Sequence, residues 1–579
     1  GLPAVVTIIM AMGVQRMSKK NVVIRKLKSV ETLGGCSVIC TDKTGTLTQN
    51  KLRVTEVFCA DEGREKLLQC MTVCSSVKTG TGGYIGDPTE IALKVYAENG
   101  GYSVAYEKLA EIPFTSERKM MSVAVTLGGE KLTFSKGASD VLIERCAFIL
   151  TPSGVRAITK EDKRSISEYC NSMSDNALRV LGFAYRNYTG AISEDGLIFI
   201  GLCGMIDGLK EGVKKAVSEC RQAGITTVMI TGDHVRTALA IAKKAGIAER
   251  EEEVMSGEQL DSLSVKERDT AITKCRVFAR VSPKHKNIIV KAFKKNGYVT
   301  AMTGDGINDA PSIKTADIGI AMGSGTDVTK NASDMVIADD NFTTIVSAVR
   351  EGRRISANVR KTIQFFLSTN LAEVLAILIA SLLFFRFDFM LSTQLLWLNL
   401  ITDSFPVLAL GMEKEDGDVM KVPPVRAEKS LFAKSSLAFI IFFGLFITAL
   451  TIGTYAVALK YLGNEVATAL TFIVISFAEL FQAFNIRSER QSVFKCGLFS
   501  NKILIFTVFG GIAVNILLAI SPLKYAFGLE CLTWQHWLIA AAVSLSIIPV
   551  GELYKLAVRV FSVKSIRSKP KKLAIKNSP

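Results

Sequence analysis

Asp42 stands at the point where a short apolar strand is expected to end. Residues 37–40 read Ser-Val-Ile-Cys, and residues 42–48 read Asp-Lys-Thr-Gly-Thr-Leu-Thr. A carboxylate at a strand end can act as a nucleophile on a phosphoryl group. The backbone N–H groups of the glycine-containing turn that follows, together with Thr44, can hold the phosphoryl oxygens. This segment therefore indicates phosphoryl-transfer chemistry.

Two further predicted strands also deliver carboxylates. Residues 226–230 lead into Thr231, Gly232 and Asp233, and a later apolar run leads into Asp305. Open α/β sheets bind their ligands at the carboxyl ends of the strands. We therefore expect these carboxylates at the ligand-binding edge of one α/β domain.

Long apolar runs fill the chain after residue 362, and each is close to the ~20 residues that span a membrane. The predicted spans are residues 362–385, 392–412, 436–459, 466–484, 503–522 and 537–556. The loops after the second and fourth spans and the tail are rich in lysine and arginine, whereas the opposite loops offer only Arg386, Lys460 and Lys524. Since basic loops stay in the cytosol, the globular block and these loops are placed there.

Polar and ionisable residues occur inside three of these spans. Such residues are costly in a bilayer, so a functional role is the default interpretation. The set comprises Asn370 and Glu373, then Asn399, Thr402 and Asp403, and finally Glu479. Spacings of three and four place the members of each span on one helix face, and Pro406 can interrupt the second span and free carbonyls. Three carboxylates suit a hard cation such as Ca²⁺. The alternative, an interhelical hydrogen-bond network, fits three acids poorly.

The heptapeptide at 42–48 and the sequence Thr-Gly-Asp-Gly-Ile-Asn-Asp-Ala-Pro at 303–311 resemble the P-type ATPases, which pump cations by phosphorylating themselves. The resemblance covers essentially the whole chain. It implies catalytic roles for Asp42, Thr44, Lys286, Asp305, Asn308 and Asp309. Asp42, Thr44 and Asp305 would surround Mg²⁺, and Lys286 would place a positive charge on the transferring phosphoryl group.

Thr44 occupies the position at which soluble phosphatases of the haloacid-dehalogenase class carry a second aspartate, their general acid and base. Without that local base an aspartyl phosphate should persist long enough to drive another process. This difference favours a pump over a phosphatase.

The same resemblance implies an ATP site. Lys136-Gly137-Ala138 is similar to the family's adenine-pocket motif, and Phe114 would stack on the base. The nucleotide-binding residues that it implies are Glu90, Phe114, Lys119, Lys136, Arg179, Thr231, Gly232, Asp233 and Arg280. Ser116 stands where the family usually has an arginine, so part of the phosphate contact is expected elsewhere.

The membrane residues resemble those of two-site calcium pumps of the sarcoplasmic-reticulum type, in a compact bacterial form. The resemblance implies Ca²⁺ export from the cytosol, driven by ATP with Mg²⁺. A family glutamate would precede residue 1, so whether there are one or two ion sites stays open. A Na⁺/K⁺ or H⁺ pump, or a nucleotide-binding relative that does not pump, are the alternatives.

Together these inferences predict a multi-domain fold that combines an α-helical transmembrane bundle, a cytosolic α/β haloacid-dehalogenase-like phosphorylation domain and an inserted α+β nucleotide-binding domain. The expected boundaries are 1–17 (end of a truncated transmembrane helix), 18–56 with 198–340 (phosphorylation), 57–197 (nucleotide), 341–361 (stalk), 362–558 (six transmembrane helices) and 559–579 (basic cytosolic tail).

We expect an integral multi-pass protein of the cell membrane whose partners are the lipid bilayer, ATP and a transported cation, with no nucleic acid and no obligate protein partner. The net charge of +16 does not indicate nucleic acid, because no basic and aromatic stripe occurs and much of the excess lies beside the apolar runs. Twelve cysteines with only three histidines make a zinc site improbable, and the lack of a glycine-rich Walker loop excludes a P-loop ATPase.

Overall fold

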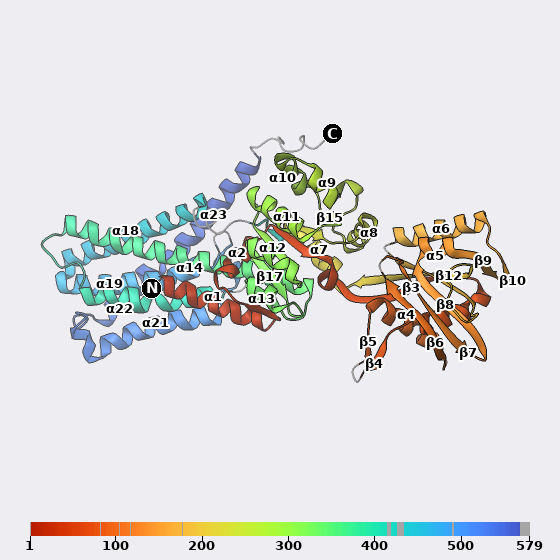
Figure 1. The fold of residues 1–579 in the computed structure, drawn as a ribbon. Helices are drawn as coiled ribbons and strands as arrows, with labels where there is room; N and C mark the ends of the chain where they lie inside the picture. The colour runs from red at the N-terminus through yellow and green to blue at the C-terminus, as the bar shows by residue number, and fades with distance from the viewer. Residues whose placement is uncertain are drawn as a thin grey trace. The chain divides into compact units, whose positions relative to one another are not determined.

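The computed structural model describes residues 2–80, 83–102, 105–115, 117–176, 178–413, 418–424, 433–488 and 491–567, the last seven of these by backbone only. Most of the predicted basic tail, Ser116 and parts of the basic loops therefore lie outside the described residues. The chain divides into two compact units. We call residues 38–221 with 225–346 the sheet unit, and residues 1–37, 222–224 and 347–579 the helical unit (Figure 1).

A parallel sheet forms one part of the sheet unit. Its strand order is β18 (Met335–Ile337), β17 (Ile318–Met322), β16 (Thr300–Gly304), β2 (Val38–Asp42), β13 (Thr226–Ile230), β15 (Val277–Ala279) and β14 (Val254–Ser256). The central strands are continuous apolar runs because helices cover both faces of a parallel sheet. The three strands predicted from their terminal carboxylates, β16, β2 and β13, lie side by side.

Helices follow the strands of this sheet. They are α7 (Val213–Gln222), α8 (Val235–Ala245), α9 (Gly257–Ser262), α10 (Val265–Lys274), α11 (Pro283–Lys295), α12 (Ala310–Thr315) and α13 (Asp327–Ala332). Ile289 and Phe293 of α11 join Val38 and Val228 of the strands in one buried core. Helix α8 ends at Gly246, which takes the left-handed conformation typical of a glycine C-cap.

A second, mostly antiparallel sheet forms the other part of this unit. Its order is β10 (Gly154–Ala157), β9 (Cys146–Thr151), β12 (Leu197–Leu209), β11 (Arg179–Asn187), β8 (Glu130–Ala138), β7 (Met120–Leu127) and β6 (Glu107–Thr115), and β3 (Thr48–Cys59) pairs with β12. A short hairpin joins β4 (Lys78–Gly80) to β5 (Gly83–Ile85). Helices α3 (Arg64–Val73), α4 (Pro88–Asn99), α5 (Ser139–Arg145) and α6 (Lys160–Asp175) accompany the sheet.

The helical unit holds the apolar part of the chain. Its longer elements are α1 (Leu2–Ser18), α14 (Phe342–Leu383, which starts in the sheet unit), α18 (Lys434–Leu462), α19 (Asn464–Ile486), α21 (Lys502–Ile520), α22 (Trp534–Leu545) and α23 (Ile547–Arg567). The shorter ones are β1 (Val22–Ile24), α2 (Lys28–Gly34) and α20 (Val493–Cys496). In the described part of the chain five helices are long and apolar enough to cross a membrane.

The second predicted span, residues 392–412, is not one continuous helix. It consists of α15 (Ser392–Trp397), a π-helical turn η5 (Leu398–Thr402) and α16 (Ser404–Gly411). The Asp403 N–H donates to the carbonyl of Leu398 (3.0 Å), one residue further back than in an α-helix. Pro406 lies in the first turn of α16, where proline is tolerated, so the irregular turn precedes the proline.

The helices of this unit differ in how much of their surface is covered. In the most apolar 18-residue stretch, 89% of residues are buried in α19 but only 22% in α21. The exposed side chains of α21 include Phe506, Phe509 and Ile520. Helix α19 is therefore central, whereas α21 presents an apolar outer face suited to lipid. Together the helical bundle, the α/β sheet and the mixed second sheet confirm the predicted fold class, while the domain boundaries stay a prediction.

Gly137 allows β8 to approach the turn before β7 closely, so Gly137→Ala should destabilise the sheet unit. A Cβ at this position would lie 2.8 Å from the carbonyl oxygen of Lys119 and 2.6 Å from the Cβ of Met120. Forcing an extra methyl into such a site costs about 2 kcal/mol. Thermal unfolding of the purified protein measures the effect. Gly208→Ala, whose Cβ would meet nothing within 4 Å, is the control, and equal midpoints for both variants would contradict this packing argument.

Candidate functional site

Three carboxylates converge at the carboxyl edge of the parallel sheet. Asp42 ends β2, Asp305 follows β16, and Asp309 closes the short 3₁₀ turn η4 (Ile307–Asp309). Each offers an oxygen within 4.8 Å of the others. The Nζ of Lys286, in the first turns of α11, donates to Asp42 Oδ2 and to Asp309 Oδ1 (2.7 Å). Residues from three distant segments thus form one acidic cluster around one lysine.

Close backbone approaches hold this cluster together. Gly45 adopts φ +70°, a conformation that favours glycine. A Cβ on Gly304 would lie 2.5 Å from the Cβ of Asp309, so only glycine lets that aspartate sit against the end of β16. The N–H of Gly306 donates to Asp309 Oδ2 (3.2 Å), which fixes the orientation of the carboxylate.

Burial and mutual repulsion set the electrostatics of the cluster. Burial raises the pKa of Asp42, an effect that the Lys286 ammonium opposes and Asp309 reinforces. Burial also raises the pKa of Asp305, with repulsion from Asp42 and Asp309 added. Burial acts to lower the pKa of Lys286, but the two carboxylates outweigh it and the pKa is raised. Three acids against one fixed cation leave the cluster suited to a divalent cation, with Asp42, Asp305 and Asp309 as ligands.

The loop after β13 lies next to this cluster. Asp233 forms an ion pair with Lys43, and the Lys43 Nζ lies 2.8 Å from Asp233 Oδ2. The Asp233 N–H donates to Thr231 Oγ1 (3.1 Å), and the Arg280 N–H donates to the Asp233 carbonyl (2.9 Å). Arg280 itself adopts φ +50°. Predicted residues Thr231, Asp233 and Arg280 are thus brought together, and Lys43, which sequence reasoning missed, links them to the segment after Asp42.

Other predicted residues at this edge are solvent-exposed. The side chains of Thr44 and Asn308 are exposed, and so is Gly232. Three supporting contacts were not predicted. Lys210 Nζ donates to the carbonyls of Gly45 (2.5 Å) and Asp340 (2.7 Å), and Thr48 Oγ1 donates to Asp207 Oδ2 (2.6 Å).

Five of the nine residues predicted to bind a nucleotide lie on or beside the second sheet: Glu90, Phe114, Lys119, Lys136 and Arg179. Lys136 of β8 is 6% exposed and donates from Nζ to Glu90 Oε1 of α4 (2.7 Å) and to the carbonyl of Cys74 (2.5 Å). Arg179, at the start of β11, donates to Thr89 Oγ1 on α4 (3.4 Å).

An aromatic side chain and a strained turn lie beside these residues. The Phe114 ring, at the end of β6, is 56% exposed. The carbonyl of Lys119, which adopts φ +56°, accepts the Ala138 N–H (2.9 Å). The partly buried Lys136–Glu90 pair therefore lies on the same sheet as an exposed aromatic ring and two further basic residues. Such a ring can stack on a planar base.

The polar residues of the apolar helices form a second acidic group, in the helical unit. Glu373 of α14, Asp403 at the start of α16 and Glu479 of α19 are at most 6% exposed. They interact electrostatically with one another. Asn399 Nδ2 donates to Glu373 Oε2 (2.9 Å), and Asn370 Nδ2 donates to the carbonyl of Phe366 (2.7 Å). The amide oxygens of both residues are left for another partner.

Within the part of the chain that the structure describes, four oxygens of these acids are buried without a hydrogen bond. They are Glu373 Oε1, Asp403 Oδ1 and both Oε atoms of Glu479. Buried carboxylate oxygens are expensive to leave unpaired. Carboxylate oxygens of this kind are the ligands that a hard cation takes up.

Sequence reasoning included Thr402 but missed Thr369, Ser476 and Asn515, which help to connect these helices. Thr369 Oγ1 of α14 donates to Asp403 Oδ2 (3.0 Å). The hydroxyls of Thr402 and Ser476 lie 3.2 Å apart and join η5 to α19, and Asn515 Nδ2 of α21 donates to Ser476 Oγ (3.1 Å). The signal was present, because Ser476 precedes Glu479 by one helical turn and Asn515 interrupts an apolar run.

Comparison with known proteins gives three family matches. Residues 64–212 match the model described as P-type ATPase, cytoplasmic domain N, and residues 387–557 match the C-terminus of cation-transporting ATPases. Residues 285–349 match haloacid dehalogenase-like hydrolases.

Similar proteins come from bacteria and animals. Calcium-transporting ATPase 1 of Bacillus cereus is 43% identical over 96% of this chain and 67% of its own length. A calcium-transporting ATPase of Bacillus subtilis is 40% identical over 94% of the chain and 66% of its own length, and the human calcium-transporting ATPase type 2C member 1 is 35% identical over 96% and 64%. The chain thus spans about two thirds of the length of these relatives.

The packing of Gly304 gives a test of the acidic cluster as a cation site. In Gly304→Ala the new Cβ would displace Asp309, so Mn²⁺ affinity should fall at least about tenfold, as expected when a ligand or its support is lost. Electron paramagnetic resonance of added Mn²⁺ measures the bound fraction. Mn²⁺ binding that is unchanged in this variant and in Asp305→Asn would rule out the cluster as the metal site.

Proposed function

We propose that this chain, which belongs to the P-type cation-transporting ATPases, carries the phosphorylation, nucleotide and ion-binding sites of an ATP-driven Ca²⁺ pump. The observation that carries the calcium assignment is the set of four unpaired carboxylate oxygens on three apolar helices. The acidic cluster around Lys286 supports the phosphorylation step.

In the proposed reaction, the Asp42 carboxylate attacks the γ-phosphorus of ATP. A P–O bond forms to Asp42 as the bond to the bridging oxygen breaks, and its electron pair leaves with ADP. Lys286, fixed between Asp42 and Asp309, faces the negative charge that the reacting oxygens carry. Mg²⁺ held by Asp42, Asp305 and Asp309, with Thr44 close in sequence, would supply further positive charge to the phosphoryl oxygens.

ATP is proposed to lie between the two sets of nucleotide residues. Phe114 would stack on the adenine beside Lys119, while Lys136, held by Glu90, would fix the pocket floor. Arg179 would reach the phosphates. Thr231, Gly232, Asp233 and Arg280 would contact the phosphate and ribose from the loop after β13, and Asn308 would position the phosphoryl group.

Ca²⁺ is the proposed cargo because it takes six to eight oxygens at flexible geometry. The unpaired oxygens of Glu373, Asp403 and Glu479 would be completed by Asn370, Asn399 and Thr402. Asp403 lies at the end of the π-helical turn, between α14 and α19, and is proposed to be shared by two sites.

The relatives are named as calcium transporters, which supports this cargo over the alternatives of Na⁺, K⁺ or H⁺. The chain is proposed to reside in the cell membrane with its sheet unit in the cytosol. The lysine and arginine bias of the predicted cytosolic loops supports that orientation.

Asp42→Asn tests the nucleophile. An amide cannot attack phosphorus, so labelling from radioactive ATP and Mg²⁺ should be abolished, whereas nucleotide binding should stay within about threefold of wild type. The assay is acid-quenched phosphorylation of the protein expressed from its complete gene, and the wild-type label should be released by hydroxylamine. Label that persists in Asp42→Asn removes Asp42 from this role.

Substitutions in the membrane test the cargo. If both proposed sites form, the protein expressed from its complete gene should bind two Ca²⁺ per phosphorylation site, and Ca²⁺ should switch on phosphorylation by ATP. Glu373→Gln removes a charge while it keeps the shape, so it should weaken one site at least about tenfold, and Asp403→Asn should disable both. Glu465→Gln, an exposed acid in the first turn of α19, is the control. A phosphoenzyme stimulated by Na⁺ and indifferent to Ca²⁺ would overturn the calcium assignment.

A further inference from the structure

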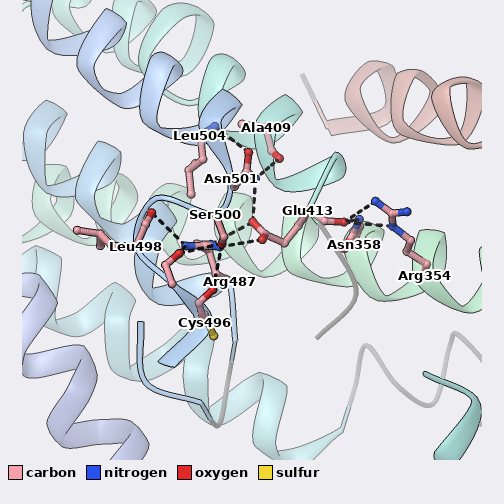
Figure 2. Close-up of polar contacts among 11 residues, drawn as sticks. Arg354, Asn358, Ala409, Glu413, Arg487, Cys496, Leu498, Ser500, Asn501 and Leu504 are labelled. Atoms are coloured by element: carbon pink, nitrogen blue, oxygen red, sulfur yellow. Dashed lines mark hydrogen bonds and ion pairs between the residues drawn. The ribbon is translucent and has the colours of Figure 1, made fainter. Parts of the chain in front are cut away.

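A buried ion pair joins the C-terminal ends of α16 and α19, two of the helices that carry the membrane acids (Figure 2). Glu413 follows the end of α16 and Arg487 follows the end of α19, and their side chains are only 7% and 2% exposed. The contact is bidentate: Arg487 Nη2 lies 3.0 Å from Glu413 Oε1, and Arg487 Nε lies 3.1 Å from Glu413 Oε2. Such a planar fork fixes orientation as well as distance.

Every N–H of the Arg487 guanidinium has an acceptor. Besides the two bonds to Glu413, Nη1 donates to the carbonyls of Gly497 (2.9 Å) and Leu498 (3.4 Å), and Nη2 also donates to Ser500 Oγ. A guanidinium has five N–H donors, and all five are used here. The arginine therefore anchors the α19 end to the segment that leads into α21.

Side-chain amides complete the end of α16. Asn501 Nδ2 donates to Glu413 Oε2 (2.8 Å) and to the carbonyl of Ala409 (3.1 Å). Asn358 of α14 donates to the carbonyls of Gly411 (3.1 Å) and Glu413 (3.0 Å). Figure 2 shows these contacts and those from Arg354 to the Glu413 carbonyl. The carbonyls at a helix end lack partners within the helix, and here side chains from two other segments supply them.

The three helices joined at this point are the ones that carry the membrane acids. Glu479 precedes Arg487 by eight residues on α19, and Asp403 precedes Gly411 by eight residues along α16. At 1.5 Å per residue, Glu479 lies ~12 Å from Arg487 along the chain, and Asp403 lies ~12 Å from Gly411, the last residue of α16. Helix α14 carries Glu373 and contributes Asn358.

Helix α16 depends on this anchor more than its neighbours do. It has only eight residues, and the π-helical turn η5 separates it from α15, so no continuous helix fixes its position from the other side. A shift of the α16 end would move Asp403 relative to Glu479. Small displacements of ligands are costly at sites that need defined geometry.

We propose that the Glu413–Arg487 ion pair is a positioning pair that holds α16 and α19 at a fixed offset and thereby sets the affinity for Ca²⁺. The inference rests on the proposed function, because it concerns the same ion site. The pair itself touches neither the cation nor its ligands. Its effect on binding passes through the two helices.

Three variants and three readouts test the pair. In Glu413→Gln and in Arg487→Lys, the Ca²⁺ concentration for half-saturation, measured by equilibrium binding of ⁴⁵Ca²⁺ without ATP, should rise at least about fivefold. The ATP concentration for half-maximal phosphorylation should stay within about twofold. In Glu413→Met/Arg487→Met no charge is left buried, so thermal stability should be near wild type while Ca²⁺ affinity stays low.

Lys555→Met is the matched control. Lys555 is fully buried and pairs with Glu552 (3.3 Å) on α23, a helix that carries none of the proposed ion ligands. It should lower stability without moving Ca²⁺ affinity. A double-methionine variant with wild-type Ca²⁺ affinity, or a Glu413→Gln shift no larger than that of Lys555→Met, would overturn the positioning role alone. A wild type indifferent to Ca²⁺ would overturn the proposed function and this inference with it.

Discussion

The cost of burying charge is the constraint on which both sites depend. An isolated carboxylate in a low-dielectric interior is strongly disfavoured. Buried acids therefore need a basic side chain, a hydrogen-bond donor or a bound metal ion as a partner. At the edge of the parallel sheet, Lys286 offsets two of three neighbouring aspartates. Among the described residues of the helical unit, no lysine pairs with the membrane acids in this way, and four of their oxygens have no hydrogen bond. The first group is thus partly neutralised by the protein, whereas the second is proposed to be neutralised by the transported cation.

The fold places these charges by two different devices. A parallel sheet delivers the carboxyl ends of neighbouring strands to one edge, which brings Asp42 and Asp305 together. Helices have no such edge, and the membrane acids meet because a helix is interrupted. The π-helical turn at 398–402 brings Asp403 between α14 and α19, in keeping with the frequent occurrence of such turns at functional sites.

An interrupted helix needs support at its ends, and the Glu413 ion pair supplies it. Removing one partner of a buried ion pair lowers the stability of the fold by about 3–5 kcal/mol, because the remaining charge is buried without a partner or water. A buried ion pair adds little net stability, because desolvation of the two charges offsets their attraction. Separating the two charges is nevertheless costly, so the pair resists displacement of the helices that it joins. The hydroxyl of Thr369 contacts Asp403 itself, and that of Ser476 contacts the neighbouring Thr402. Helix α16 is therefore held next to Asp403 and also at its other end, ~12 Å along the helix.

The sequence alone determined the elements and their chemistry. Apolar runs that end in Asp42, Asp233 and Asp305 indicated the strands, because local hydrophobic pattern and a terminal carboxylate are both local properties. Spacings of three and four residues likewise placed the membrane acids on helix faces. Only the tertiary structure decided which distant residues meet. Lys286 contacts Asp42 across 244 residues, Lys43 pairs with Asp233, and Glu413 pairs with Arg487. Such contacts depend on how the elements pack. The local sequence around a basic residue does not specify which distant acid it will contact.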